Sequence, residues 1–143
     1  MKLNYHLPGC DLSLAGVASS DLKKKLLQLG VPPAIIKKAV ISLYEAEINM
    51  VIHGGGGDVE IEITPEEITS VVSDKGPGIA DIELAMQEGF STASDLIREM
   101  GFGAGMGLPN IKKNSDFLDI KSSQGEGTTL TIKVRLDAAP VRQ

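Results

Sequence analysis

The amino-acid sequence predicts an α/β fold, a two-layer α/β sandwich whose mixed, mostly antiparallel sheet is covered by helices on one face. Apolar residues recur with helical spacing between residues 14 and 53, and the period changes to two at Val59. The strand-like segments after this point come in two neighbouring pairs, a pattern typical of antiparallel hairpins rather than of parallel βαβ units. The 143 residues, 42% of them hydrophobic, suffice for a single domain with a buried core, which we expect to span residues 1–143.

The first half of the chain predicts one strand and two helices. Residues 2–7 form a weakly patterned strand, and residues 14–29 an amphipathic helix that ends at Gly30. The apolar positions of this helix are Leu22, Leu26 and Leu29. A second helix is expected to begin at Pro32-Pro33, since proline is tolerated in the first turn of a helix, and to run to about His53. Its apolar face carries Ile36, Ala39, Val40, Leu43, Ala46 and Met50.

The second half predicts two hairpins separated by a less regular region. Val59 to Ile63 alternates apolar and acidic residues, as a half-buried strand does. The other expected elements are a strand over residues 68–73, a helix over 81–87, a helix over 108–114, and strands near 116–122 and 128–136. Residues 88–104 have no clean periodicity, and we expect them to be mobile without a bound ligand.

Charge and composition exclude several classes of function. Fourteen Lys and Arg against nineteen Asp and Glu leave no basic surface for nucleic acid, and five aromatic residues cannot form a base-stacking platform. Cys10 alone allows neither an internal disulfide nor a cysteine metal cage. The first residues lack the apolar core of a signal peptide, and no apolar run reaches membrane-spanning length. We therefore expect a cytoplasmic protein that contacts neither nucleic acid nor membrane.

The sixteen glycines are unevenly distributed, and the densest array lies between Gly101 and Gly107. This array fits neither register of the dinucleotide motif G-x-G-x-x-G, and a Walker-type loop is excluded because the chain contains no Gly-Lys pair. Backbone N–H groups before a helix can hold phosphates, but a glycine array alone is more typical of a hinge or tight turn. The run from Gly54 to Gly57 has no evident purpose beyond ending a helix.

Glu45 and Asn49 share one face of the second expected helix, flanked by Ile41, Ile48 and Ile52. A carboxylate in this position can accept a proton from a hydroxyl nucleophile, and an asparagine oxygen can bind a hard cation such as Mg²⁺. Taken alone, the pair can also be an ordinary solvated patch.

Two further motifs lie at strand ends, and each also has a simple structural interpretation. Asp74, followed by Gly76 and Gly78, can accept a hydrogen bond from an exocyclic amine while the glycines admit a flat ring, or it can form a plain turn. Gly127-Thr128 belongs to a hairpin turn. His6 and His53 lack metal-ligand spacing; we expect His53 to cap its helix and the aromatic residues to lie in the core.

The order of these motifs is more specific than any one of them. Glu45-x-x-x-Asn49, Asp74-x-Gly76-x-Gly78, Gly103-x-Gly105-x-Gly107-Leu108 and Gly127-Thr128 resemble the N, G1, G2 and G3 boxes of the GHKL (Bergerat-fold) ATPases. A stand-alone domain of this size resembles, within that superfamily, the bacterial anti-sigma-factor and switch-type protein serine/threonine kinases.

The resemblance implies a binding site for ATP and Mg²⁺. Asp74 would bind the adenine amine, Asn49 would ligate Mg²⁺, Thr128 would support the adenine site, and Glu45 would act as catalytic base toward a partner hydroxyl. The remaining residues that it implies as ATP-binding are Gly76, Gly78, Ile79, Gly103, Gly105, Met106, Gly107 and Leu108.

Three functions remain open on the sequence. The first is an ATP- and Mg²⁺-dependent kinase that phosphorylates Ser or Thr of a small STAS-type partner protein. The second is a nucleotide-gated binding module that sequesters a sigma factor or another regulator, and the third is a free-standing ATPase. Glu45 favours the first function, because a pure binder needs no base beside a metal-binding asparagine. The resemblance also suggests a homodimer.

Overall fold

The computed structural model describes residues 1–9, 12–53, 55–76, 107–123 and 125–136. The elements in chain order are β1 (Lys2–Pro8), the 3₁₀ turn η1 (Leu12–Leu14), α1 (Val17–Gln28), α2 (Pro33–His53), β2 (Gly56–Ile63), β3 (Glu67–Asp74), α5 (Gly107–Lys113), β4 (Phe117–Ser123) and β5 (Gly127–Arg135). The helix expected over residues 81–87 and the segment 88–104 lie outside the described residues.

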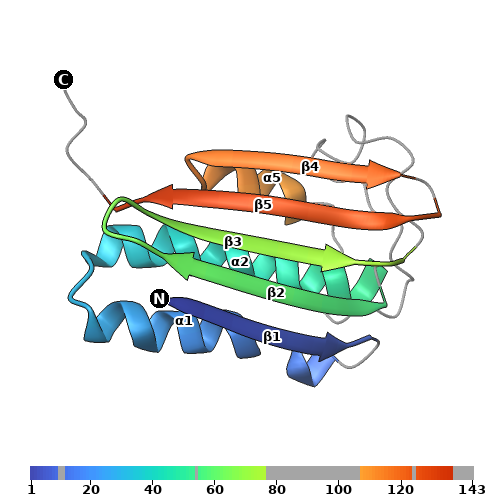
Figure 1. Cartoon of the computed structure of the whole chain (residues 1–143), viewed down its shortest axis with the longest axis horizontal. Coiled ribbons are helices and arrows are strands. Elements are labelled where there is room, and N and C mark those ends of the chain that lie inside the picture. The colour runs from blue at the N-terminus through green and yellow to red at the C-terminus, as the bar shows by residue number, and fades with distance from the viewer. Residues whose placement is uncertain (10–11, 54, 77–106, 124, 137–143) are drawn as a thin grey trace.

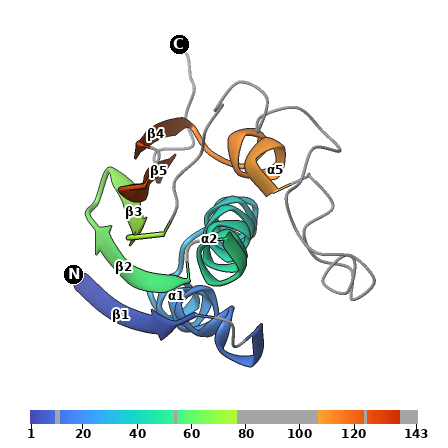
Figure 2. The same ribbon diagram turned by 90° about the vertical axis from the view of Figure 1, so that its right-hand side faces the viewer.

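The strands form one sheet in the order β1-β2-β3-β5-β4, and all four pairings of the described strands are antiparallel. The helices α1, α2 and α5 lie side by side against one face of this sheet, with α2 in the middle (Figures 1 and 2). The predicted two-layer α/β sandwich is therefore confirmed. None of the helices in the described part of the chain is long and apolar enough to cross a membrane.

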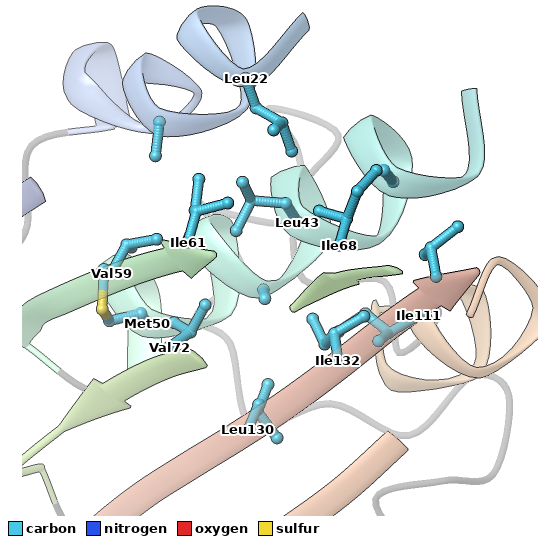
Figure 3. Close-up of a cluster of buried hydrophobic side chains, with 14 of the residues drawn as sticks. Leu22, Leu43, Met50, Val59, Ile61, Ile68, Val72, Ile111, Leu130 and Ile132 are labelled. Atoms are coloured by element: carbon cyan, nitrogen blue, oxygen red, sulfur yellow. The ribbon is translucent and has the colours of Figure 1, made fainter. Parts of the chain in front are cut away.

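Strand register decides which side chains face the helices. Val59 pairs with Val72, and Val72 pairs with Leu130, so that these three buried residues form one row across the sheet. Their neighbours along β2, Glu60 and Glu62, point to the opposite face and are exposed. Figure 3 shows the helix-facing rows meeting side chains of α1, α2 and α5 in one apolar core.

The core confirms most of the predicted apolar faces and corrects others. Leu22, Leu26, Leu43, Ala46 and Met50 are buried as expected. Leu29, in contrast, is 52% exposed, because α1 ends at Gln28 and the chain turns away at Gly30. Two aromatic residues expected in the core are also exposed: Tyr44 on the outer side of α2, and Phe117 on the open sheet face beside Lys133.

The glycine run after α2 lies where β1 and β2 begin to pair. Gly56 has a φ of 94°, and a Cβ there would lie 2.4 Å from the backbone nitrogen of Gly9 and 2.5 Å from the carbonyl oxygen of Leu7. Only glycine satisfies both the positive φ and this close approach. The run therefore both ends a helix and lets the end of β1 contact the start of β2.

A buried carboxylate joins α1 to α2. The Glu47 side chain is completely buried, and its Oε2 accepts hydrogen bonds from the backbone N–H groups of Gly16 (2.8 Å) and Ala18 (3.1 Å), while Oε1 accepts one from Ser19 (2.7 Å). Gly16 occupies the N-cap position of α1 and has no side chain to cap the helix. Glu47 thus satisfies, from a neighbouring helix, N–H groups that a helix start leaves unpaired.

We predict that Glu47→Ala lowers the free energy of unfolding by about 3 kcal/mol, because three N–H groups, two of them in buried hydrogen bonds, lose their acceptor. Thermal and urea unfolding measure this loss. Glu60→Ala is the matched control, since Glu60 is exposed on β2, and it is expected to change stability by less than about 0.5 kcal/mol. Equal stability of the two variants would contradict the capping role of Glu47.

Candidate functional site

One face of α2 carries the polar residues Glu45, Asn49 and His53, each four positions after the last. All three side chains are half-buried, so they do not belong to a fully solvated patch. Ile48, which flanks them, is buried, and Ile41 and Ile52 are half-buried. The helix rise places Glu45 and His53 about 12 Å apart along the axis.

Glu45 lies at the end of this polar face that meets α5, beside Asn110. Burial raises the pKa of the Glu45 carboxyl above its usual value, and Asn110 opposes this shift. A half-buried carboxylate with a raised pKa has a property expected of a general base.

Asp74 lies at the opposite end of the face, at the last position of β3. Its Oδ1 accepts a hydrogen bond of 2.9 Å from the backbone N–H of Gly76, which folds the predicted turn back onto the carboxylate. Asp74 pairs across the sheet with Gly57 on one side and Thr128 on the other. Because Leu7, in the same row, faces the core, Asp74 and Thr128 face the helices.

The Thr128 hydroxyl is held from β4. Its Oγ1 lies 2.9 Å from Oγ of Ser122, its cross-strand partner, and the Ser122 hydroxyl also lies 3.1 Å from the carbonyl oxygen of Gly127. The structure therefore places Asp74 and Thr128 in direct register across β3 and β5. Ser122 was not predicted from the sequence.

Gly127 is pressed against the backbone of Asp74. Its φ is 99°, and a Cβ there would lie 2.1 Å from the Asp74 carbonyl oxygen and 2.8 Å from Cα of Lys75. The residue was expected to form a hairpin turn, and the structure adds this close contact with the strand that carries Asp74.

His53 connects the helix to Asp74. Burial lowers the pKa of the His53 imidazole, and the negative charge of Asp74 opposes this shift. The sequence predicted only that His53 caps its helix; the electrostatic effect of Asp74 on its pKa was not predicted. Glu45 and Asp74 therefore mark the two ends of a continuous polar strip along α2.

Of the predicted phosphate-facing residues, Gly107 and Leu108 open α5, where Leu108 is buried in the core. Gly78, Ile79, Gly103, Gly105 and Met106 lie outside the described residues.

The oxygen atoms on the polar face of α2 suit Mg²⁺ better than a metal held only by protein side chains. Within the described ranges, no group of three or more His, Cys, Asp or Glu side chains converges as a metal site. An asparagine oxygen beside a carboxylate suits Mg²⁺, which retains water ligands and binds phosphate oxygens rather than filling an all-protein cage. Asn49 fits this arrangement.

Comparison with known proteins agrees with this geometry. Residues 37–138 match the family described as histidine kinase-, DNA gyrase B- and HSP90-like ATPases. This chain belongs to that family. The match contains the α2 polar face, Asp74, α5 and Thr128, and membership means that the chain uses ATP.

Several relatives carry the names of a serine/threonine-protein kinase and of anti-sigma F factors. The chain is 30% identical to the serine/threonine-protein kinase RsbT of Bacillus subtilis over 119 residues, covering 80% of this chain and 84% of RsbT. It is 39% identical to an anti-sigma F factor of Thermoanaerobacter over 133 residues, covering 90% and 87% of the two chains. An anti-sigma F factor of Clostridium novyi is 33% identical and covers 95% of this chain and 94% of its own length.

Solved structures confirm the fold. The RsbU and RsbW domains of Rv1364c from Mycobacterium tuberculosis superpose with a TM-score of 0.64 at 20% identity, covering 94% of this chain and 32% of that one. A chain of the SiaB–SiaC complex from Pseudomonas aeruginosa gives 0.55 at 14% identity, covering 93% and 89%.

Gly127→Ala is expected to lower the free energy of unfolding by about 3 kcal/mol, because it combines an unfavourable φ with a clash against Asp74. Gly125→Ala is the matched control: Gly125 also has a positive φ, 84°, but a Cβ there would meet no atom within 4 Å. We expect the control to cost about 1 kcal/mol. Chemical unfolding of both variants measures the difference, and equal losses would contradict the close contact.

Proposed function

We propose that this chain is an ATP- and Mg²⁺-dependent protein kinase that transfers the γ-phosphate to a Ser or Thr hydroxyl of a small STAS-type partner protein. This proposal rests on the half-buried Glu45 carboxylate, which lies one helical turn before Asn49 on α2. The same helix ends at His53, close to Asp74. The relatives named serine/threonine-protein kinase and anti-sigma F factor support a regulatory protein that binds a partner protein. Use of ATP fits a cytoplasmic location.

In this proposal, the nucleotide lies along the α2 polar face. Adenine would sit at Asp74, where Oδ1 already accepts from Gly76 and Oδ2 could accept from the exocyclic amine. Thr128, in register with Asp74, would support the same ring, with Gly76, Gly78 and Ile79 around it. The triphosphate would extend toward Glu45 and the start of α5, where Gly103, Gly105, Met106, Gly107 and Leu108 would contact it.

Proton transfer is the proposed task of Glu45. The acceptor hydroxyl oxygen forms a bond to the γ-phosphorus as the bond to ADP breaks, and the hydroxyl proton passes to the Glu45 carboxylate. Asn49 would hold Mg²⁺, which neutralises phosphate charge when bound. Positioning and charge neutralisation supply most of the catalysis of phosphoryl transfer, so few residues suffice.

A nucleotide-gated binding module is the second candidate, because relatives at 33% and 39% identity carry the name anti-sigma F factor. In that case ATP binding would control the capture of a sigma factor, and Glu45 would be dispensable. The two candidates are separated by the consequences of Glu45 substitution.

Asp74→Asn is expected to abolish stabilisation by ATP, because an amide nitrogen replaces one acceptor oxygen at the adenine site. Wild-type protein at an ATP concentration of 100 times Kd should gain about 2.7 kcal/mol. A thermal-shift titration with ATP and Mg²⁺ measures this gain. Asp58→Asn, on the exposed face of β2, is the control that should keep it. Full ATP stabilisation of Asp74→Asn would remove the adenine assignment.

Glu45→Gln is expected to bind ATP normally and to transfer phosphate at least about 100-fold more slowly, since removing a general base costs about that much. The assay uses labelled ATP and the STAS-domain proteins of the same host, each expressed singly, with Glu62→Gln on the exposed sheet face as the control. Because burial raises the pKa of Glu45, wild-type transfer should fall on acidification at a pH above the usual glutamate pKa. Undiminished transfer by Glu45→Gln would favour the binding module.

A further inference from the structure

We infer that Ser122 is a positioning residue that fixes the Thr128 hydroxyl as a hydrogen-bond acceptor, and thereby favours adenine over a purine that carries a carbonyl group in place of the amine. The inference rests on the proposed function, since it takes adenine to lie at Asp74 and Thr128. Ser122 lies outside the four sequence motifs from which the site was predicted.

Three polar side chains stand next to one another at one end of the sheet. Ser122 on β4 pairs with Thr128 on β5, and Thr128 pairs with Asp74 on β3. Leu118 and Ile120, two and four positions before Ser122, pack against the apolar core, so Ser122 also faces the helices. Side chains that are direct partners across antiparallel strands lie about 5 Å apart at Cβ, close enough to act on one ligand group.

Two distances decide which of the two hydroxyl groups donates. Ser122 Oγ lies 3.1 Å from the carbonyl oxygen of Gly127, and since a carbonyl only accepts, the Ser122 hydroxyl donates in this bond. Ser122 Oγ also lies 2.9 Å from Thr128 Oγ1. Because a serine hydroxyl has a single proton, Thr128 donates in the second bond. The lone pairs of Thr128 Oγ1 then remain to accept from a ligand.

The acceptor of the Ser122 proton is held in place by the fold. Gly127 has a φ of 99°, and its backbone lies so close to β3 that a Cβ would come within 2.1 Å of the Asp74 carbonyl oxygen. The orientation of the Thr128 hydroxyl is therefore set by backbone packing before any nucleotide binds, as precise recognition requires.

This orientation matches the two donors of an adenine amine. Asp74 Oδ1 accepts from the backbone N–H of Gly76, which leaves Oδ2 for one amine N–H, and Thr128 Oγ1 can accept the other. A base with a carbonyl group at the same ring position would set an acceptor against Thr128 Oγ1. Its ring N–H could still donate to Asp74, so we assign this part of the discrimination to Thr128 and, through it, to Ser122.

Equilibrium titration with ATP and with inosine triphosphate (ITP), each with Mg²⁺, tests the inference. ITP carries a carbonyl group where ATP carries the amine. We expect Ser122→Ala to lower the ratio of the Kd for ITP to the Kd for ATP about 10-fold, because the freed Thr128 hydroxyl can rotate and donate to the carbonyl. Ser122→Thr keeps a hydroxyl and should keep the ratio.

Thr129→Val is the matched control, because it removes a hydroxyl from the next residue of β5, on the opposite face of the sheet. Ser122→Cys is a second test variant that fills a similar space with a weak donor, and it should lower the ratio as alanine does. In a Thr128→Val background, Ser122→Ala should leave the ratio unchanged, since the hydroxyl that it orients is gone.

The ratio separates positioning from a merely structural role, which would weaken the binding of both nucleotides alike. A ratio for Ser122→Ala within about twofold of wild type would overturn the inference, and so would a further change in the Thr128→Val background. Full ATP stabilisation of Asp74→Asn would refute the adenine placement and the inference with it. Undiminished phosphate transfer by Glu45→Gln would refute the kinase proposal alone, because the ratio of binding constants does not depend on transfer.

Discussion

The rotation of α2 about its axis is the constraint on which the rest of the site depends. Leu43, Ala46 and Met50 bury one side of the helix against the sheet, and Glu47 fixes another side by accepting three hydrogen bonds from the start of α1. With two sides engaged, the remaining polar face has only one orientation available. Glu45 therefore meets α5, and His53 lies within the electrostatic influence of Asp74. A helix rotated by one residue would present Tyr44 or Ala46 in place of the Glu45 carboxylate.

Strand register imposes the second constraint, at the Asp74 end of the polar face. Asp74 and Thr128 face the helices together only because β3 and β5 pair antiparallel in a register that a one-residue shift would invert. Gly127 permits this register, since its hydrogen atom occupies the space that a Cβ would need against the Asp74 carbonyl. The glycine that appears in the sequence as part of a hairpin turn thus also sets the distance between the two strands that carry the site.

Much of this architecture could be predicted from the sequence, because it depends on local patterns. The change of apolar period at Val59 predicted the positions of the helices and hairpins. The order of the motifs predicted the ATPase family, and the match over residues 37–138 confirms it. Contacts between distant segments could not be predicted in this way. The Glu47 carboxylate accepts from N–H groups 28 to 31 positions away at the start of α1, and no spacing rule connects these residues. Glu47 did leave a trace, since it shares the helical face of Leu43 and Met50, where a charged residue is out of place unless it is paired.

Two glutamates two positions apart on α2 show why chemistry must be assigned from contacts. Burial raises the pKa of both Glu45 and Glu47, so neither the residue type nor the direction of the shift separates them. Their partners do. Both oxygens of Glu47 are engaged by backbone N–H groups deep in the core, where no substrate can reach them. Glu45 is only half-buried and lies on the polar face of α2 with Asn49 and His53. Burial and position, rather than acidity, assign Glu47 to holding the fold and make Glu45 the candidate base.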